Sequence, residues 1–159
     1  MNELTEKEAL NKAAAYCTAS ERCCSEVTSK LVQWGVDVKT QEKILKRLLD
    51  ERFIDEERYC RFFVNDKFRF NKWGRMKISQ ALYMKKIPSS VFSRYLEEIE
   101  ERDYMNVLRS LLSSKRKSIR DNDDYQLNMK LIRFALSRGF EMNIIRKCLQ
   151  LSDEYDLLD

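Results

Sequence analysis

The chain has 159 residues, of which 43% are hydrophobic and 35% charged, and its formal net charge is +4. The apolar share is sufficient for a folded core and excludes a disordered chain, while 3 Gly and 1 Pro are too few for hairpins, β-sandwiches or glycine-rich phosphate loops. Histidine is absent, which excludes His-based catalytic triads and most transition-metal sites.

This composition predicts an all-α protein that is not an enzyme. Its Lys, Cys and carboxylate residues form no recognisable active-site pattern, so we expect no cofactor and no metal. The cysteines lack CxxC spacing and are expected to be reduced, mostly buried thiols: Cys17, Cys23, Cys24, Cys60 and Cys148. No stretch of about 18 apolar residues could span a membrane, and the acidic N-terminus does not resemble a secretory signal, so we expect a cytoplasmic protein.

Hydrophobic periodicity and capping residues predict about nine helices along the chain. The first follows the capping box TEKE at residues 5–8. The others are expected near residues 24–34, 39–52, 55–70, 75–86, 89–100, 103–114, 125–137 and 141–151. The polar, aperiodic segment 113–124 predicts a mobile linker, and a short acidic tail follows the last helix.

Three segments share a pattern across a turn, which predicts an internal repeat. Gly35, Lys86 and Gly139 occupy the same place in it, separated by 51 and then 53 residues, and each precedes an apolar residue. Any three helix pairs share some apolar positions, but the fixed offsets favour a repeat. We therefore predict three tandem three-helix repeats with boundaries 1–52, 53–102 and 103–159. Such repeats form elongated, curved proteins suited to binding.

Positive charge is concentrated in one window of the sequence. Residues 58–86 contain nine basic and one acidic residue, a net charge of +8. Residues 1–57 have 9 basic and 12 acidic residues, and residues 87–159 have 12 and 13. A solvated helix face ordinarily mixes acids with bases, so this window predicts a surface for a polyanion or an acidic protein.

A helical projection of FIDEERYCRFFVNDKFRFNKWG, residues 53–74, separates its aromatic rings from its cations. Three rings fall on one apolar face and are predicted to be core: Tyr59, Phe63 and Phe70. Only Phe68, on the opposite side, and Trp73, beyond the helix end, remain to stack on unpaired bases. Trp73 fits better as a packing anchor at a helix corner.

The cations of this window form the predicted contact surface for the partner. Its residues are Arg58, Arg61, Arg69, Lys72, Arg75 and Lys77. A second basic cluster comprises Lys115, Arg116 and Lys117. It is consistent either with an accessory phosphate contact or with an ordinary soluble loop.

Several segments, in the same order, resemble the RecX family, regulatory proteins of the bacterial RecA recombinase. They are SEVTSKLVQWGV at 25–36, FIDEERYCRFFVNDKFRFNKWGRMKI at 53–78 and FALSRGF at 134–140. The length and the three-helix repeat also resemble that family. The sequence departs from the family pattern at Val27, where Leu is usual, at Cys23, where a Ser cap is usual, at Lys86, where the other repeats have Gly, and in its acidic C-terminus.

The resemblance implies a non-catalytic modulator of RecA. RecX-like proteins bind RecA and its nucleoprotein filament on single-stranded DNA, lodge in the filament groove, and inhibit recombinase, ATPase and SOS co-protease activity. The expected partners are therefore RecA, its filament and single-stranded DNA, with no membrane. The chain is expected to be a monomer.

Two other classes of function stay open from the sequence. A sequence-nonspecific nucleic-acid-binding helical protein without a recombinase partner would bind DNA or RNA tightly by itself, and salt would weaken this binding steeply. A helical scaffold for an acidic protein would bind its partner without nucleic acid. A helix-turn-helix transcription factor is less favoured, because no helix concentrates Arg, Asn and Gln for base edges.

Overall fold

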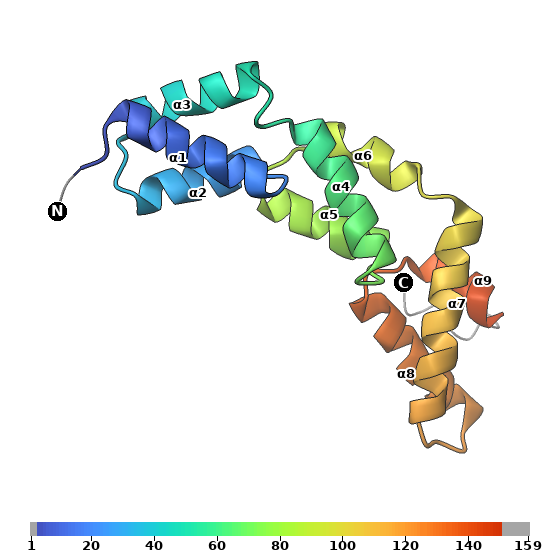
Figure 1. The fold of residues 1–159 in the computed structure, drawn as a ribbon. Helices are drawn as coiled ribbons and strands as arrows, with labels where there is room; N and C mark the ends of the chain where they lie inside the picture. The colour runs from blue at the N-terminus through green and yellow to red at the C-terminus, as the bar shows by residue number, and fades with distance from the viewer. Residues whose placement is uncertain (1–2, 151–159) are drawn as a thin grey trace. The chain divides into compact units, whose positions relative to one another are not determined.

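The computed structural model describes residues 3–150, and this part of the chain contains nine helices and no strand (Figure 1). The helices are α1 (Glu6–Ala19), α2 (Cys24–Gln33), α3 (Val38–Asp50), α4 (Glu56–Arg69), α5 (Arg75–Met84), α6 (Ser89–Glu97), α7 (Glu101–Ser118), α8 (Asp124–Ser137) and α9 (Met142–Leu149). The prediction of an all-α fold is confirmed. None of these nine helices is long and apolar enough to cross a bilayer.

The predicted mobile linker is wrong over half of its length, because residues 113–118 belong to α7. The polar run Lys115, Arg116 and Lys117 forms the last turn of that helix, where cations interact favourably with the helix dipole. The Lys115 ammonium also lies 5.2 Å from the centre of the Phe134 ring on α8. Helix-end electrostatics and a tertiary contact therefore extend a helix that lacks apolar periodicity there.

The helix starts agree with the capping residues in the sequence. The Thr5 hydroxyl accepts from the Glu8 N–H at 3.1 Å, and the Thr5 N–H donates to Glu8 Oε1 at 3.2 Å. At the start of α2, the Cys23 N–H donates to Glu26 Oε1 at 3.1 Å. Glu26 therefore supplies its half of a capping box even though a thiol replaces the usual hydroxyl.

The three turns predicted to correspond close with the same backbone pattern. Gly35, Lys86 and Gly139 have left-handed φ angles of 78°, 63° and 95°. In each turn the next residue donates its N–H to the carbonyl five residues earlier, a Schellman-type ending. The donor and acceptor pairs are Val36 to Leu31, Ile87 to Leu82 and Phe140 to Ala135. Lys86 thus adopts the conformation that the other two positions give to glycine.

The helices belong to two compact units. The first contains the residues up to Phe63 and the segment Leu82–Phe92, and the second contains Val64–Ala81 and the residues from Ser93 onward. Helices α4, α5 and α6 each contribute one end to each unit. The boundaries of three separate repeats stay a prediction.

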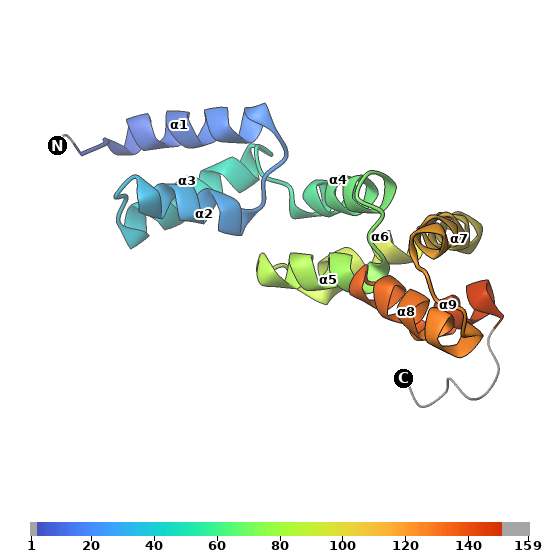
Figure 2. The same cartoon turned by 90° about the horizontal axis from the view of Figure 1, so that it is seen from below.

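The first unit is built on α1, α2 and α3, which lie side by side (Figure 2). The fully buried residues of the core cluster between these helices are small on α1 and aliphatic elsewhere: Ala9, Ala13, Val27, Leu31, Ile44, Leu48 and Ile54. Alanines on α1 let the other two helices approach closely, and each buried aliphatic side chain stabilises the unit by about 1.5–3 kcal/mol.

In the second unit, α7, α8 and α9 pack against one another around Tyr104, which is fully buried. The Tyr104 ring stacks on Phe68 at a centroid distance of 5.8 Å and meets Phe140 at 5.0 Å. Aromatic pairs in such geometries contribute beyond the area they bury. Phe68, from the C-terminal half of α4, is therefore a core residue of this unit.

The rings of α4 only partly follow the helical projection. Tyr59 and Phe63 are buried as predicted. The prediction of Phe70 as a core residue is wrong, because its side chain is 82% exposed. The prediction of Phe68 as a solvent-facing ring is also wrong, because it is 1% exposed. The projection assumed one buried face, whereas the two halves of α4 bury different side chains in two different units.

The cysteines of the described chain are all free thiols, as predicted. Cys17, Cys23 and Cys60 are buried, and Cys24 and Cys148 are half-buried. Burial raises the pKa of the Cys60 thiol to about 12, so it stays protonated and packs as a small apolar side chain.

Candidate functional site

The positive charge of the sequence window 58–86 is divided between the two units of the structure. The described residues of the first unit include 13 basic and 12 acidic side chains, a net charge of +1. Those of the second unit include 17 basic and 10 acidic side chains, a net charge of +7. The described part of the second unit therefore has the larger excess of positive charge, the property that favours a polyanionic partner.

Two of the predicted contact residues, Arg58 and Arg61, lie on the N-terminal half of α4 in the first unit. The Arg58 Nε lies 2.7 and 2.8 Å from the two carboxylate oxygens of Glu21, which raises the pKa of its guanidinium. Its Nη2 donates to the Arg52 and Phe53 carbonyls at 3.2 and 3.4 Å. Arg58 thus closes the α3–α4 turn onto its own unit, while Arg61 is exposed.

The other four predicted residues lie in the second unit, around the turn between α4 and α5. We name residues 69–77 the basic corner, after its cations Arg69, Lys72 and Lys77. Its backbone is tightly held: the Trp73 N–H donates to the Lys67 carbonyl at 3.0 Å, and Lys72 has a left-handed φ of 59°. The Lys72 ammonium donates to the Arg69 carbonyl at 2.6 Å.

A backbone clamp fixes the basic corner to the turn between α8 and α9. The Gly74 N–H donates to the Arg138 carbonyl at 2.7 Å, and the Met76 N–H donates to the Gly139 carbonyl at 2.9 Å. A Cβ on Gly74 would lie 2.4 Å from the Gly139 carbonyl carbon, and a Cβ on Gly139 would lie 2.4 Å from the Lys77 Cβ. Both positions therefore require glycine for this close approach.

Arg75 faces inward and holds the second unit together. Its guanidinium donates to the Leu96 carbonyl at 3.1 Å and the Ile99 carbonyl at 3.3 Å, and pairs with Glu141 at 3.0 Å. It lies 3.9 Å from the centre of the Tyr104 ring, and the Tyr104 hydroxyl donates to the same Glu141 carboxylate. Burial raises the pKa of Tyr104 well above its usual range, so this hydroxyl remains a donor. With a side chain 22% exposed, Arg75 joins α5, the α6–α7 connection, α7 and the start of α9.

The remaining cations of the basic corner reach its surface. The Arg69 side chain is 58% exposed, and its Nη2 lies 3.9 Å from Asp103, a long contact for an ion pair. Lys72 is exposed, and Lys77 is half-buried. The Lys67 and Lys77 ammonium groups lie 5.3 and 4.7 Å from the centre of the Trp73 ring, which is itself half-buried. These contacts fit Trp73 as a packing anchor.

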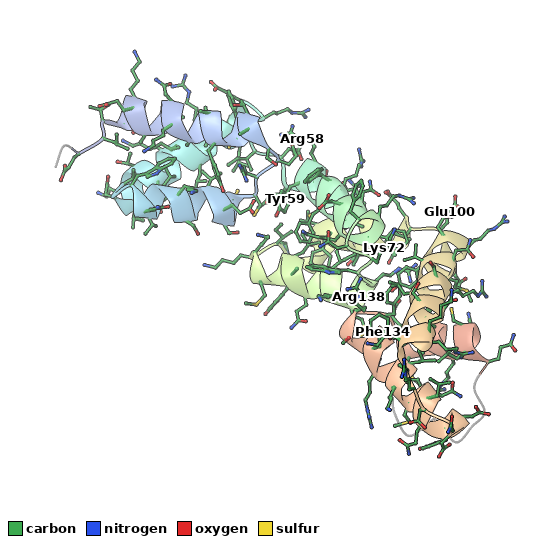
Figure 3. All side chains as sticks on the ribbon, turned by 60° about the horizontal axis from the view of Figure 1, so that its bottom comes forward. Arg58, Tyr59, Lys72, Glu100, Phe134 and Arg138 are labelled. Atoms are coloured by element: carbon green, nitrogen blue, oxygen red, sulfur yellow. The ribbon has the colours of Figure 1, made fainter. Side chains whose placement is uncertain are left out.

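The structure adds two residues to this site that the charge window does not indicate. Arg138, from the end of α8, donates from Nη2 to the Asn71 carbonyl at 2.9 Å, beside Lys72 (Figure 3). Its guanidinium also lies 5.9 Å from the centre of the Phe134 ring. The second is the exposed ring of Phe70. The RGF turn in the sequence was a signal for Arg138, while no local signal marks Phe70.

The second basic cluster lies on the last turn of α7. Arg116 and Lys117 are exposed, whereas Lys115 is half-buried against Phe134. Arg116 lines a pocket of about 220 Å³ together with Arg109 and Cys148. The cluster is a helix end carrying three cations, and a phosphate contact there stays a prediction.

Comparison with protein families gives two adjoining matches. The family model described as RecX, second three-helix domain, matches residues 55–96, and the model described as RecX, third three-helix domain, matches residues 102–149. Together the two matches include more than half of the chain.

Curated relatives agree with these matches. The chain is 29% identical to the regulatory protein RecX of Clostridium botulinum over 162 residues, covering 98% of this chain and 76% of the relative. It is 27% identical to that of Prosthecochloris aestuarii over 150 residues, covering 94% of this chain and 96% of the relative. The Bacillus mycoides protein of the same name is 25% identical over 156 residues, and the chain spans only 57% of its length.

Two solved structures share the fold. The crystal structure of a regulatory protein RecX superposes with a TM-score of 0.82 at 19% identity, covering 91% of this chain and 75% of the other. The crystal structure of RecX from Lactobacillus salivarius gives a TM-score of 0.81 at 21% identity, with coverage of 96% and 97%. At this level of identity the likeness concerns the arrangement of the helices.

Proposed function

This chain belongs to the RecX family, and from that premise we propose that it binds the RecA filament on single-stranded DNA and inhibits it. The inhibition would extend to the recombinase, ATPase and SOS co-protease activities of RecA. The proposed action is non-catalytic, since binding alone is enough to block filament growth. The proposed place of action is the cytoplasm.

The observation that carries this proposal, beside family membership, is the net charge of +7 on the described residues of the second unit, which is +3 when the four acids of residues 151–159 are counted. DNA phosphates supply most of the affinity of a nonspecific nucleic-acid complex, and they do so through Lys and Arg side chains. The basic corner presents Arg69 and Lys72 on a backbone fixed by the clamp at Gly74 and Gly139. A surface of this kind can follow phosphates without reading sequence.

We assign the contact surface to Arg69, Lys72 and Lys77 of the second unit, with Arg138 bonded to Asn71 beside Lys72. Arg61, in the first unit, is proposed as a separate contact. Arg58 and Arg75 are better suited to holding the fold, because their guanidinium groups are engaged by carboxylates and backbone carbonyls of their own units. The cluster Lys115, Arg116 and Lys117 is proposed as an accessory contact.

The test is RecA ATPase activity on single-stranded DNA with increasing amounts of this protein. We expect the ATPase rate to fall as the protein approaches the amount of RecA. No inhibition at an excess of the protein would overturn the proposed function.

A second candidate function, a nucleic-acid-binding protein without a recombinase partner, is favoured by the same charge and by the exposed Phe70 ring. It predicts tight binding to DNA by the isolated chain and no further gain when RecA is added. Weak binding alone, with firm binding once RecA coats the strand, would support the RecA modulator and exclude this alternative.

A further inference from the structure

We propose that Phe70 is a stacking platform for one unpaired base of single-stranded DNA. The ring lies at the C-terminal end of α4, next to the exposed Arg69 and two residues before the exposed Lys72. The inference deepens the proposed function, on which it rests for the choice of DNA as the polyanion. It adds a base contact to a surface argued so far from phosphate contacts alone.

The exposure of Phe70 is the first observation. Its side chain is 82% exposed, whereas Phe68, two residues earlier, is 1% exposed and packs on Tyr104. Burying a phenylalanine stabilises a fold by the transfer of its ring from water, and Phe70 contributes almost none of this. The ring is therefore available to a partner, and replacing it should leave the fold intact.

The backbone that carries the ring is rigid, which is the second observation. The Phe70 N–H donates to the Asp66 carbonyl at 2.9 Å, and the Trp73 and Gly74 N–H groups donate at 3.0 and 2.7 Å to Lys67 and Arg138. The left-handed Lys72 turns the chain directly after the ring. Because the backbone is held in place before binding, only the side-chain rotation of Phe70 has to be fixed when a base stacks on it.

The charge around the ring is the third observation, and it selects the ligand. Proteins that hold single strands without sequence preference combine an aromatic ring for a base with cations for the backbone phosphates. Arg69 and Lys72 provide the cations, and the described residues of their unit have a net charge of +7. The nearest carboxylate recorded for Arg69 is that of Asp103, at 3.9 Å. An apolar protein partner would gain nothing from these cations. A single strand with an unstacked base between two phosphates would use both the ring and the cations.

The first unit offers a matched control in Tyr83, whose side chain is 73% exposed. Tyr83 is followed by Met84, which is 74% exposed, and the next cation, Lys85, pairs with Glu26 at 3.0 Å. The ring is thus as accessible as Phe70 but lies in a unit that is close to neutral. Comparing the two positions separates base stacking from the general loss of an exposed aromatic ring.

The experiment measures the affinity of the full chain for a fluorescent thymidine oligonucleotide of roughly 20 nucleotides and for its abasic counterpart, which keeps every phosphate. We expect Phe70→Leu to weaken binding to the thymidine strand by about 10-fold and to leave abasic binding unchanged. Phe70→Trp should retain wild-type affinity, and Tyr83→Leu should change neither strand. Thermal unfolding of Phe70→Leu should match that of the wild type.

Three results would overturn the stacking platform. The first is that Phe70→Leu binds the thymidine strand with wild-type affinity. The second is that Phe70→Leu loses affinity equally for the thymidine strand and the abasic strand. The third is that the wild-type protein binds the two strands with equal affinity. The RecA ATPase assay separates this failure from failure of the proposed function. If the wild type inhibits RecA while Phe70→Leu binds the thymidine strand normally, the function stands and the stacking inference falls. If the wild type does not inhibit RecA while Phe70→Leu loses affinity only for the thymidine strand, the stacking inference stands and the proposed function falls.

Discussion

The described residues of the two compact units differ in both kinds of charge, with 13 basic and 12 acidic side chains in the first unit and 17 basic and 10 acidic in the second. In the first unit, Arg58 and Lys85 belong to the basic sequence window, yet they pair with Glu21 and Glu26, which are 37 and 59 positions away in the chain. In the second unit, the exposed Arg69 has only a long contact with Asp103, and Lys72 donates to a backbone carbonyl. A stretch of basic residues in the sequence therefore does not necessarily form a basic surface, because acidic residues distant in the sequence pair with some of its cations.

The units also differ in how closely their glycine turns approach other backbone. Gly35 in the first unit needs its positive φ, but a Cβ there would meet nothing within 4 Å. Gly74 and Gly139 in the second unit lie in direct backbone contact. The glycine clamp fixes the position of the basic corner, whereas Gly35 in the first unit makes no such backbone contact.

The largest expected effect tests that clamp. Gly74→Ala should destabilise the protein by about 3 kcal/mol or more, because the new Cβ collides with the backbone of Gly139 and neither segment can move independently. Gly35→Ala, the matched control, should lose only about 1 kcal/mol from its left-handed conformation. Urea unfolding of both variants measures the difference. Equal losses would mean that the clamp adds nothing to stability.

The next effect concerns binding and distinguishes the location of charge from its amount. Reversing Arg69, Lys72 and Lys77 to Glu should lower affinity for single-stranded DNA by about 100-fold and reduce the logarithmic salt slope by about three. Reversing Lys39, Lys43 and Lys46 on α3 changes the net charge equally in the first unit. That control should retain most of the affinity at moderate salt. Similar losses in both triple variants would show that net charge alone is responsible.

A smaller effect compares two arginines from the same basic window. Arg75→Met should destabilise the protein by about 2 kcal/mol, because it removes the guanidinium donor from two carbonyls and from Glu141, which keeps only the Tyr104 hydroxyl. Arg75→Lys should not restore this stability, since one ammonium cannot reach three separate acceptors. Arg58→Met removes a more exposed pair and should lose about 1 kcal/mol or less. Chemical denaturation checks the order, and a larger loss at Arg58 would contradict it.

The smallest expected effect lies in the first unit, at Glu56. Burial raises the pKa of this carboxyl above its ordinary value of 4.5, and its Oε2 is buried without a hydrogen-bond partner. The folded state therefore favours the protonated form, and its advantage is lost as pH rises through the folded pKa. Glu56→Gln should be more stable than the wild type at pH 7, and the two should converge as the pH falls towards 4.5.

Thermal unfolding across this pH range measures the convergence. A constant difference between Glu56→Gln and the wild type at every pH would show that Glu56 is ionised without penalty. Glu57→Gln, one residue further along α4 at an exposed position, is the matched control for removing one carboxylate.

Much of the fold was predictable from the sequence because it depends on interactions between residues a few positions apart. Capping at Thr5 and Glu8, the left-handed turn at Gly35 and the periodic apolar residues of α2 act within one or two helical turns. The corresponding turns at Lys86 and Gly139 followed from the repeat pattern. The positive window was visible as well, because counting charges requires no structure.

Only the tertiary structure decided which members of that window can face a partner. Arg75 and Glu141 are 66 positions apart, and no periodicity links them. Phe68 is buried and Phe70 is exposed, which is the opposite of what the helical projection predicted. The projection represents one buried face, whereas α4 supplies side chains to two cores. The sequence by itself therefore determined the helices, their turns and the sign of the charge. The packing of segments distant in sequence determined which rings and cations remain at the surface, since burial and ion pairing depend on neighbours in space.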